Sequence, residues 1–161
     1  MTWYLPQLEK AVYDRLAADT GTGGLFNVSS PLVTACYNGE VKAEQAYPFL
    51  SLNVVSAPSQ DSMDTRVRLV TMDVHVYCKK SQDPGDSSCD GMDVGGKIIE
   101  RVVGDWDQQS SRSPTFGLDR WKPTLTSWVA DNFRSIEERA DHEDGVYHWV
   151  LTFEVYVSRR V

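Results

Sequence analysis

The sequence contains few of the residues that usually carry out chemistry. Only three histidines and three cysteines occur among its 161 residues. No C-x-x-C pair suggests a zinc site or thioredoxin-like redox activity, and the odd cysteine count leaves at least one without an intramolecular partner. Cations are scarce too, with 16 Lys and Arg against 23 Asp and Glu and a net charge of −7. Because broad phosphate binding needs clustered cations, the composition argues against an extended nucleic-acid-binding surface.

Long apolar runs are also missing. No stretch approaches the roughly 20 residues of a membrane span, and the N-terminal residues lack a signal-peptide pattern. We therefore expect a protein that is made and used in a cytoplasm, without a membrane partner. Hydrophobic residues make up 41% of the chain and charged residues 24%, which is typical of a globular protein with a real core. We expect one domain that covers residues 1–161.

The clearest pattern in the chain is an alternation over residues 66–78. Successive side chains of a β-strand point to opposite faces, so the alternation predicts one long strand with a core face and a polar face. Cys78 shares the apolar parity and is expected to be a buried thiol. The apolar positions are Val70, Met72, Val74, Val76 and Cys78. The polar positions are Thr71, Asp73, His75 and Tyr77.

A second long alternation, over residues 146–157, predicts a terminal strand. The turn sequence before it, Asp141 to Gly145, indicates a hairpin. The expected core positions are Trp149, Leu151, Phe153, Val155 and Val157, and the expected polar positions are His148, Thr152, Glu154 and Tyr156. Shorter strands are predicted over residues 32–37, 47–55, 124–129 and 133–139.

Apolar residues at helical spacing predict two helices, over residues 5–18 and 90–106. Ser88 or Asp90 is a plausible N-cap of the second helix. Gly95 and Gly96 each cost about 1 kcal/mol of helix propensity, which favours a close approach of this helix to the sheet. The element order predicts an α+β fold: a mainly antiparallel or mixed β-sheet with two α-helices packed on one face.

Two glycine-containing segments are best interpreted as connections. Residues 19–24 are glycine-rich, but they follow a helix and no lysine comes after them, so they form a turn and not a phosphate-binding loop. Asn38-Gly39 is typical of a tight turn, whereas the charged residues 40–45 favour a longer loop.

No convergent catalytic group emerges, so we assign no catalytic residue, cofactor or metal ligand. His75 and His148 share the polar parity of their strands and could approach each other, with Asp73 nearby. A metal site normally has a third or fourth donor at fixed spacing, so ordinary surface histidines are favoured. His142-Glu143 matches half of a zinc-protease signature but lies in a turn and lacks the second histidine.

The polar face of the sheet is the candidate site. It must meet either water or another protein, and its mixture of Tyr, Thr and charge is compatible with a subunit interface. Aromatic residues expected to be exposed around Trp121 and Trp128 favour the interface. The candidate interface or lumen residues are Thr71, Asp73, His75, Tyr77, Thr152, Glu154 and Tyr156.

The chain resembles the tail terminator (tail completion) proteins of tailed bacteriophages, the minor tail protein U type. The resemblance lies in the order of the elements and in four segments. These segments are Ala11-Val-Tyr-Asp-Arg-Leu-Ala17, Tyr47-Pro-Phe-Leu-Ser-Leu52, Met72-Asp-Val-His-Val-Tyr77 and Val150-Leu-Thr-Phe-Glu-Val155. The long connection over residues 104–123 departs from the family pattern.

This resemblance implies a structural virion protein, without catalytic residues, that is assembled in the host cytoplasm. It would form a ring, commonly a hexamer, at the head-proximal end of the tail, where it stops polymerisation of the tail tube. Implied partners are further copies of the chain, the tail tube protein, the neck or head-completion protein and, in a contractile tail, the terminal ring of the sheath. DNA would pass through the lumen without specific binding. The alternatives are a neck or head–tail connector subunit and, from another class, a small hydrolase or ligand-binding domain that uses the His75/His148 face.

Overall fold

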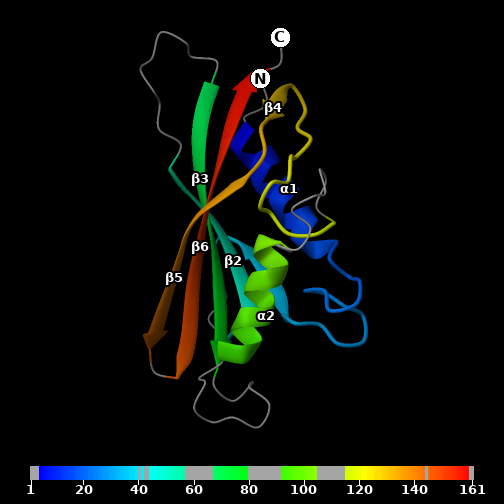
Figure 1. Cartoon of the computed structure of the whole chain (residues 1–161), viewed down its shortest axis with the longest axis vertical. Helices are drawn as coiled ribbons and strands as arrows, with labels where there is room; N and C mark the ends of the chain where they lie inside the picture. The colour runs from blue at the N-terminus through cyan, green and yellow to red at the C-terminus, as the bar shows by residue number, and fades with distance from the viewer. Residues whose placement is uncertain are drawn as a thin grey trace.

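The fold consists of two helices on one side of a twisted six-stranded sheet (Figure 1). The structure is a computed structural model, and it describes residues 4–39, 41, 44–56, 67–79, 92–104, 115–143 and 145–159. The helices are α1 (Tyr4–Ala17) and α2 (Met92–Val103). This arrangement confirms the predicted α+β class. Neither helix in the described part of the chain is long and apolar enough to cross a membrane.

The strands follow the order β1-β2-β3-β6-β4, and β5 also pairs with β6. Their bounds are β1 (Ala35–Asn38), β2 (Phe49–Ser56), β3 (Val67–Lys79), β4 (Trp128–Ala130), β5 (Arg134–Glu143) and β6 (Val146–Arg159). β1 runs parallel to β2 and the other pairs are antiparallel, so the sheet is mixed. A parallel pair cannot be joined by a tight hairpin, so Asn38-Gly39 opens a longer connection. The predicted β5–β6 hairpin is confirmed, and β2 pairs with β3 as an antiparallel ribbon.

Some predicted boundaries were wrong. The strand expected over residues 124–129 is reduced to β4, with Thr124 bridged to Val129 alone. The strand expected to end at Arg139 continues to Glu143, because its pairing with β6 extends to the hairpin. The second helix ends at Val103, before Gly104, which has a φ of 120°. The proposed caps Ser88 and Asp90 lie outside the described residues, as does Cys89.

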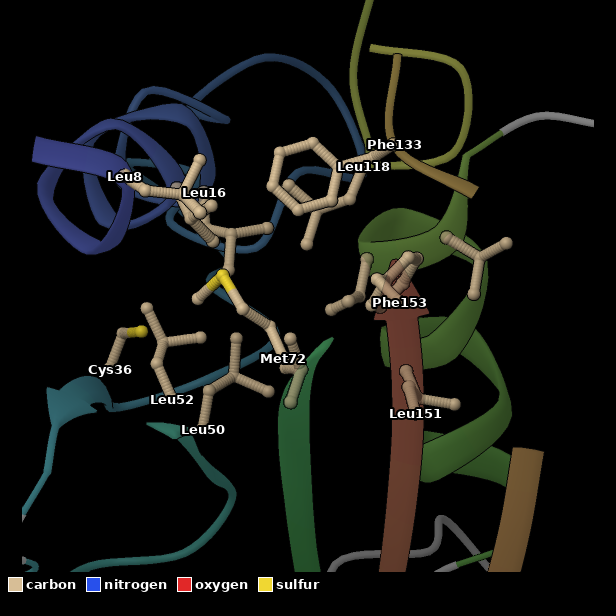
Figure 2. Close-up of a cluster of buried hydrophobic side chains, with 14 of the residues drawn as sticks. Leu8, Leu16, Cys36, Leu50, Leu52, Met72, Leu118, Phe133, Leu151 and Phe153 are labelled. Atoms are coloured by element: carbon tan, nitrogen blue, oxygen red, sulfur yellow. The ribbon is translucent and has the colours of Figure 1, made fainter. Parts of the chain in front are cut away.

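The core lies between the helices and the inner face of the sheet (Figure 2). Leu8 and Leu16 project from α1 toward Met72 of β3, and Leu50 and Leu52 of β2 lie beside Met72. All the apolar positions predicted for the core face of β3 are buried, and Cys78 is fully buried as expected. The core positions predicted on β6 are buried as well.

The turn after α1 is anchored to α2 by an ion pair with little solvent exposure. The Asp19 carboxylate accepts hydrogen bonds from Nε of Arg101, at 2.9 Å, and from Nη2 of the same guanidinium. It also accepts a bond from the backbone N–H of Leu25 at 3.1 Å. A side chain at Gly24 would lie 2.4 Å from the carbonyl oxygen of Asp19, so the turn requires glycine there. The glycines of residues 19–24 therefore form a structural turn, as predicted.

The two glycines of α2 have different surroundings. A Cβ on Gly95 would lie 1.8 Å from the Trp149 ring of β6, so this glycine permits the predicted close approach to the sheet. A Cβ on Gly96 would meet nothing within 4 Å. The close-approach interpretation is thus confirmed for Gly95 and wrong for Gly96.

The adjacent substitutions Gly95→Ala and Gly96→Ala should change stability in opposite directions. Gly96→Ala should raise the free energy of unfolding by about 0.5–1 kcal/mol, because alanine is the better helix former. Gly95→Ala should lower it by about 1–3 kcal/mol, since the added methyl displaces the Trp149 ring. Urea denaturation followed by tryptophan fluorescence measures both. Equal stabilisation by the two alanines would contradict the packing of α2 on Trp149.

Candidate interaction face of the sheet

The sheet face turned away from the helices is called here the outer face. Antiparallel pairing of β3 with β6 sets Asp73 opposite Thr152 and Thr71 opposite Glu154. The predicted candidate residues therefore lie on one continuous surface: Thr71, Asp73, His75, Tyr77, Thr152, Glu154 and Tyr156. The alternation of the two strands was sufficient to bring them together.

An aromatic strip, consisting of Tyr47, Phe49, Tyr77, His148 and His75, crosses the outer face. Phe49 stacks on Tyr77 with ring centroids 4.6 Å apart, and Tyr77 stacks on His148 at 4.3 Å with an interplanar angle of 8°. Tyr47 packs against Phe49 at 5.1 Å, and Nζ of Lys79 lies 4.4 Å from the Tyr47 ring centroid. Offset contacts of this kind stabilise by about 0.5–1.5 kcal/mol per pair beyond simple burial. The strip joins β2, β3 and β6 on the side that the helices leave uncovered.

The sequence interpretation missed Tyr47 and Phe49 as members of this face. Phe49 is only 3% exposed, although it does not belong to the main cluster of core side chains. The signal was present in the sequence, because Tyr47 and Phe49 share the parity of the polar residues Ser51 and Asn53 in this strand. The sequence alone did not reveal that Phe49 stacks on Tyr77 of the neighbouring strand.

His75 and His148 form a hydrogen-bonded pair within the strip. Nδ1 of His75 lies 2.8 Å from Nε2 of His148, so one nitrogen donates and the other accepts. Such a bond requires at least one neutral imidazole. Burial lowers the pKa of His75, an effect that Asp73 opposes and Arg139 reinforces. Burial also lowers the pKa of His148, His75 and Arg139 lower it further, and Asp141 opposes them.

Among the residues that the structure describes, the pair has no additional donors of the kind that a metal centre requires. Within the described ranges, no three or more His, Cys, Asp or Glu side chains form a group able to hold a metal ion. The Asp73 carboxylate instead accepts a 2.7 Å hydrogen bond from the Thr152 hydroxyl. The arrangement favours lateral cohesion of the strands over metal-dependent chemistry.

Charges of both signs border the aromatic strip. β5 sets Asp141 opposite His148 and Arg139 opposite Val150, and Arg134 lies 3.8 Å from the carboxylate of Glu154. From Ile136 to Asp141 this strand is exposed to solvent. A partly apolar centre with a mixed polar border is the usual composition of a protein–protein interface.

Apolar side chains are exposed where β3, β4 and β6 meet at one end of the outer face. Tyr156 is 49% exposed, Val67 41% and Val129 36%. Together with Lys122 and Asp131 they line a groove of about 330 Å³. We call this the Tyr156 groove.

The expectation that Trp121 and Trp128 are exposed was wrong. Both are partly buried against the core. Trp121 stacks on Phe133 at 5.7 Å, and Trp128 packs on Tyr4 at 4.9 Å. At this end of the outer face, the exposed apolar side chains are Tyr156, Val67 and Val129.

Comparison with solved structures shows a likeness of fold. The fold is similar to that of a chain in the solved structure "Virion of native gene transfer agent (GTA) particle", with a TM-score of 0.61. The two share 16% sequence identity, and the match covers 95% of this chain and 96% of that chain. At this identity the likeness shows a common fold. No family model and no curated protein sequence matches the chain.

The histidine pair should make stability depend on pH near neutrality. Unfolded histidines titrate near 6.5 and the folded pair below that value, so the unfolded chain binds more protons as the pH falls. The free energy of unfolding should therefore decrease between pH 7.5 and 5.5, above the range where most carboxylates titrate. Urea denaturation at both pH values measures this decrease.

The matched variant is His75→Phe/His148→Phe, which keeps two aromatic rings in the strip and retains His142. It should lose a clear part of the decrease between pH 7.5 and 5.5. An undiminished decrease would show that other groups cause it.

Proposed function

We propose that this chain is a structural virion protein of a phage-like particle, without enzymatic activity. The observation that carries the proposal is the similarity of fold, over nearly the whole of both chains, to a chain of the gene transfer agent virion. The sequence resemblance to tail terminator proteins points in the same direction. The outer face supports an assembly role, because it combines stacked aromatics with a mixed polar border.

The finer proposal is a tail terminator. In this role the chain forms a ring, commonly of six copies, on the head-proximal end of the tail tube, ends tube polymerisation and presents a docking surface to the neck. Its partners are further copies, the tube protein, the neck or head-completion protein and, in a contractile tail, the sheath's terminal ring. The net charge of −7 suits a conduit, because a negative lumen does not retain passing DNA.

Within such a ring, we assign the outer face to contact between subunits and not to the lumen. A lumen that repels DNA needs a surplus of negative charge, whereas here Arg134, Arg139 and Lys79 accompany the acidic groups. The half-buried stacked rings are better suited to another protein surface than to a water-filled channel. The residues assigned to this contact are Thr71, Asp73, His75, Tyr77, Thr152, Glu154 and Tyr156.

The purified protein should form rings. Light scattering should give a mass that is a multiple of the subunit's 18.1 kDa, and negative-stain images should contain closed rings with a central hole. Particles assembled without the protein should carry tails of uncontrolled length, because nothing then stops tube growth. A strict monomer, together with normal tails in its absence, would refute the terminator role.

The main alternative is a neck or head–tail connector subunit. Antibody labelling of particles distinguishes the two roles when heads and tails are separated after labelling. The label should stay with the tails if the protein is a terminator. Label that remains with the heads would favour the connector.

A further inference from the structure

The two hydrogen-bonded histidines occupy a diagonal position on the outer face. His148 is the register partner of Tyr77. The register partner of His75 is Val150, so the two imidazoles come from neighbouring rows of the β3–β6 ladder. Their ring centroids are 5.0 Å apart, and Nδ1 of His75 lies 2.8 Å from Nε2 of His148. Both side chains are half-buried, so water reaches the pair from the outer side.

The bond limits the number of protons that the pair can hold. When both imidazoles are neutral, one facing nitrogen donates and the other accepts. A first added proton gives one imidazolium, which can still donate to the neutral ring. A second proton places an N–H on each of the two facing nitrogens, so no acceptor remains and two positive charges oppose each other. The doubly protonated pair therefore cannot keep the 2.8 Å contact.

The charged groups that face the pair do not remove this conflict. Asp73 lies on the same face but accepts a 2.7 Å hydrogen bond from the Thr152 hydroxyl. Asp141 of β5 is the register partner of His148, and Arg139 of the same strand adds a positive charge. Burial and Arg139 lower the pKa of both histidines below the ordinary value of 6.5, against the opposing effect of the carboxylates. The second proton is therefore taken up only in acid.

Among the described residues, the neighbours on the β2 side of the pair carry no charge. Phe49 and Ser51 of β2 are the register partners of Tyr77 and His75. Burial raises the pKa of the Tyr77 phenol, so this group stays neutral as the pH falls. The Tyr77 ring lies between Phe49, at 4.6 Å, and His148, at 4.3 Å. Movement of His148 therefore uncovers one face of Tyr77.

The strands do not depend on the histidines for their pairing. The backbone register of β3 with β6 is continuous from Val67 to Lys79. The buried side chains of both strands, such as Val74 and Leu151, point to the opposite face, on the side of the helices (Figure 1). The two imidazoles can therefore separate and turn to water while the core stays packed.

We infer that the His75–His148 pair is an acid-operated switch of the outer face. At neutral pH the shared hydrogen bond holds the aromatic strip closed. In mildly acidic solution the second proton breaks this bond, parts His148 from Tyr77 and leaves β3 paired with β6. The switch is a property of a single copy.

A consequence for assembly rests on the proposed function, in which the outer face is the contact between subunits. Two added protons place positive charge beside Arg139 within that contact. Burial of charge without a partner is unfavourable, so protonation should weaken the contact. Rings that form at pH 7.5 should therefore separate in acid and form again on neutralisation.

NMR of ring-labelled histidine and tyrosine, together with methyl-labelled valine and leucine, tests the switch between pH 7.5 and 5.0. This range lies above the pH at which most carboxylates titrate. The shared N–H proton should exchange slowly with water at pH 7.5 and rapidly at pH 5.0. The Tyr77 ring signals should shift in step with the second protonation, while the methyl signals of Val74 and Leu151 keep their positions.

Two variants identify the groups responsible. His75→Phe/His148→Phe should abolish the shift of Tyr77, and His142→Phe, which removes the third histidine of the chain, should leave it unchanged. Three results would overturn the inference: Tyr77 signals that stay constant while the pair takes up two protons, a pair that takes up no second proton above pH 5.0, and core methyl signals that move together with Tyr77. An undiminished shift in the double variant would do the same.

Light scattering at the two pH values tests the consequence for assembly. The mass should fall from that of the ring toward the subunit's 18.1 kDa at pH 5.0 and recover at pH 7.5. The double phenylalanine variant should keep the ring mass at both values. Rings that persist at pH 5.0 after Tyr77 is released would refute the outer face as the contact and leave the switch intact. A monomer at pH 7.5 would refute the ring, and the NMR result would still decide the switch.

Discussion

The antiparallel pairing of β3 with β6 is the constraint on which the rest of the structure depends. Every residue of β3, from Val67 to Lys79, has a partner on β6. A slip of one residue would move each side chain of the slipped strand to the opposite face. On β3 it would turn Val74 to solvent and bring His75 into the core. One register therefore builds the packing surface for both helices and also assembles the outer face.

The same alternation explains how much of the fold and of the site the sequence could predict. Long strands with strict parity, β3 and β6, were predicted almost to the residue, and the histidines that the sequence analysis said could approach each other do so. β5 was harder to predict because its residues from Ile136 to Asp141 are exposed, so no apolar parity marks them. Its length is determined by its partner β6. The parallel pairing of β1 with β2 likewise depends on the packing of the whole sheet, since β1 is only four residues long.

Aromatic residues mark the limit of prediction from local pattern. Trp121 stands in a polar connection and Trp128 begins the short strand β4, and both were expected to be exposed, but contacts distant in sequence cover them. The Arg15 guanidinium lies 5.3 Å from the Trp121 ring centroid, and its Nε donates to the Gly117 carbonyl oxygen at 3.1 Å. Phe49 is a similar case, because a lateral stack on Tyr77 buries an outer-face residue. In both cases burial depends on a partner that no local window contains.

The Asp19–Arg101 pair holds the loop between α1 and β1 in place against α2. A buried ion pair gains little net stability, because desolvation of two charges offsets most of their attraction. What this pair supplies is position: three donors fix one carboxylate, and that carboxylate fixes Leu25 in the loop between α1 and β1. The Phe116 ring, 3.5 Å from the Arg101 guanidinium, restricts the cation further. An apolar pair of similar size could hold α1 and α2 together equally well, but it would not orient the loop through hydrogen bonds. The desolvation free energy of the two charges is therefore offset by a defined loop conformation on the helix side of the molecule.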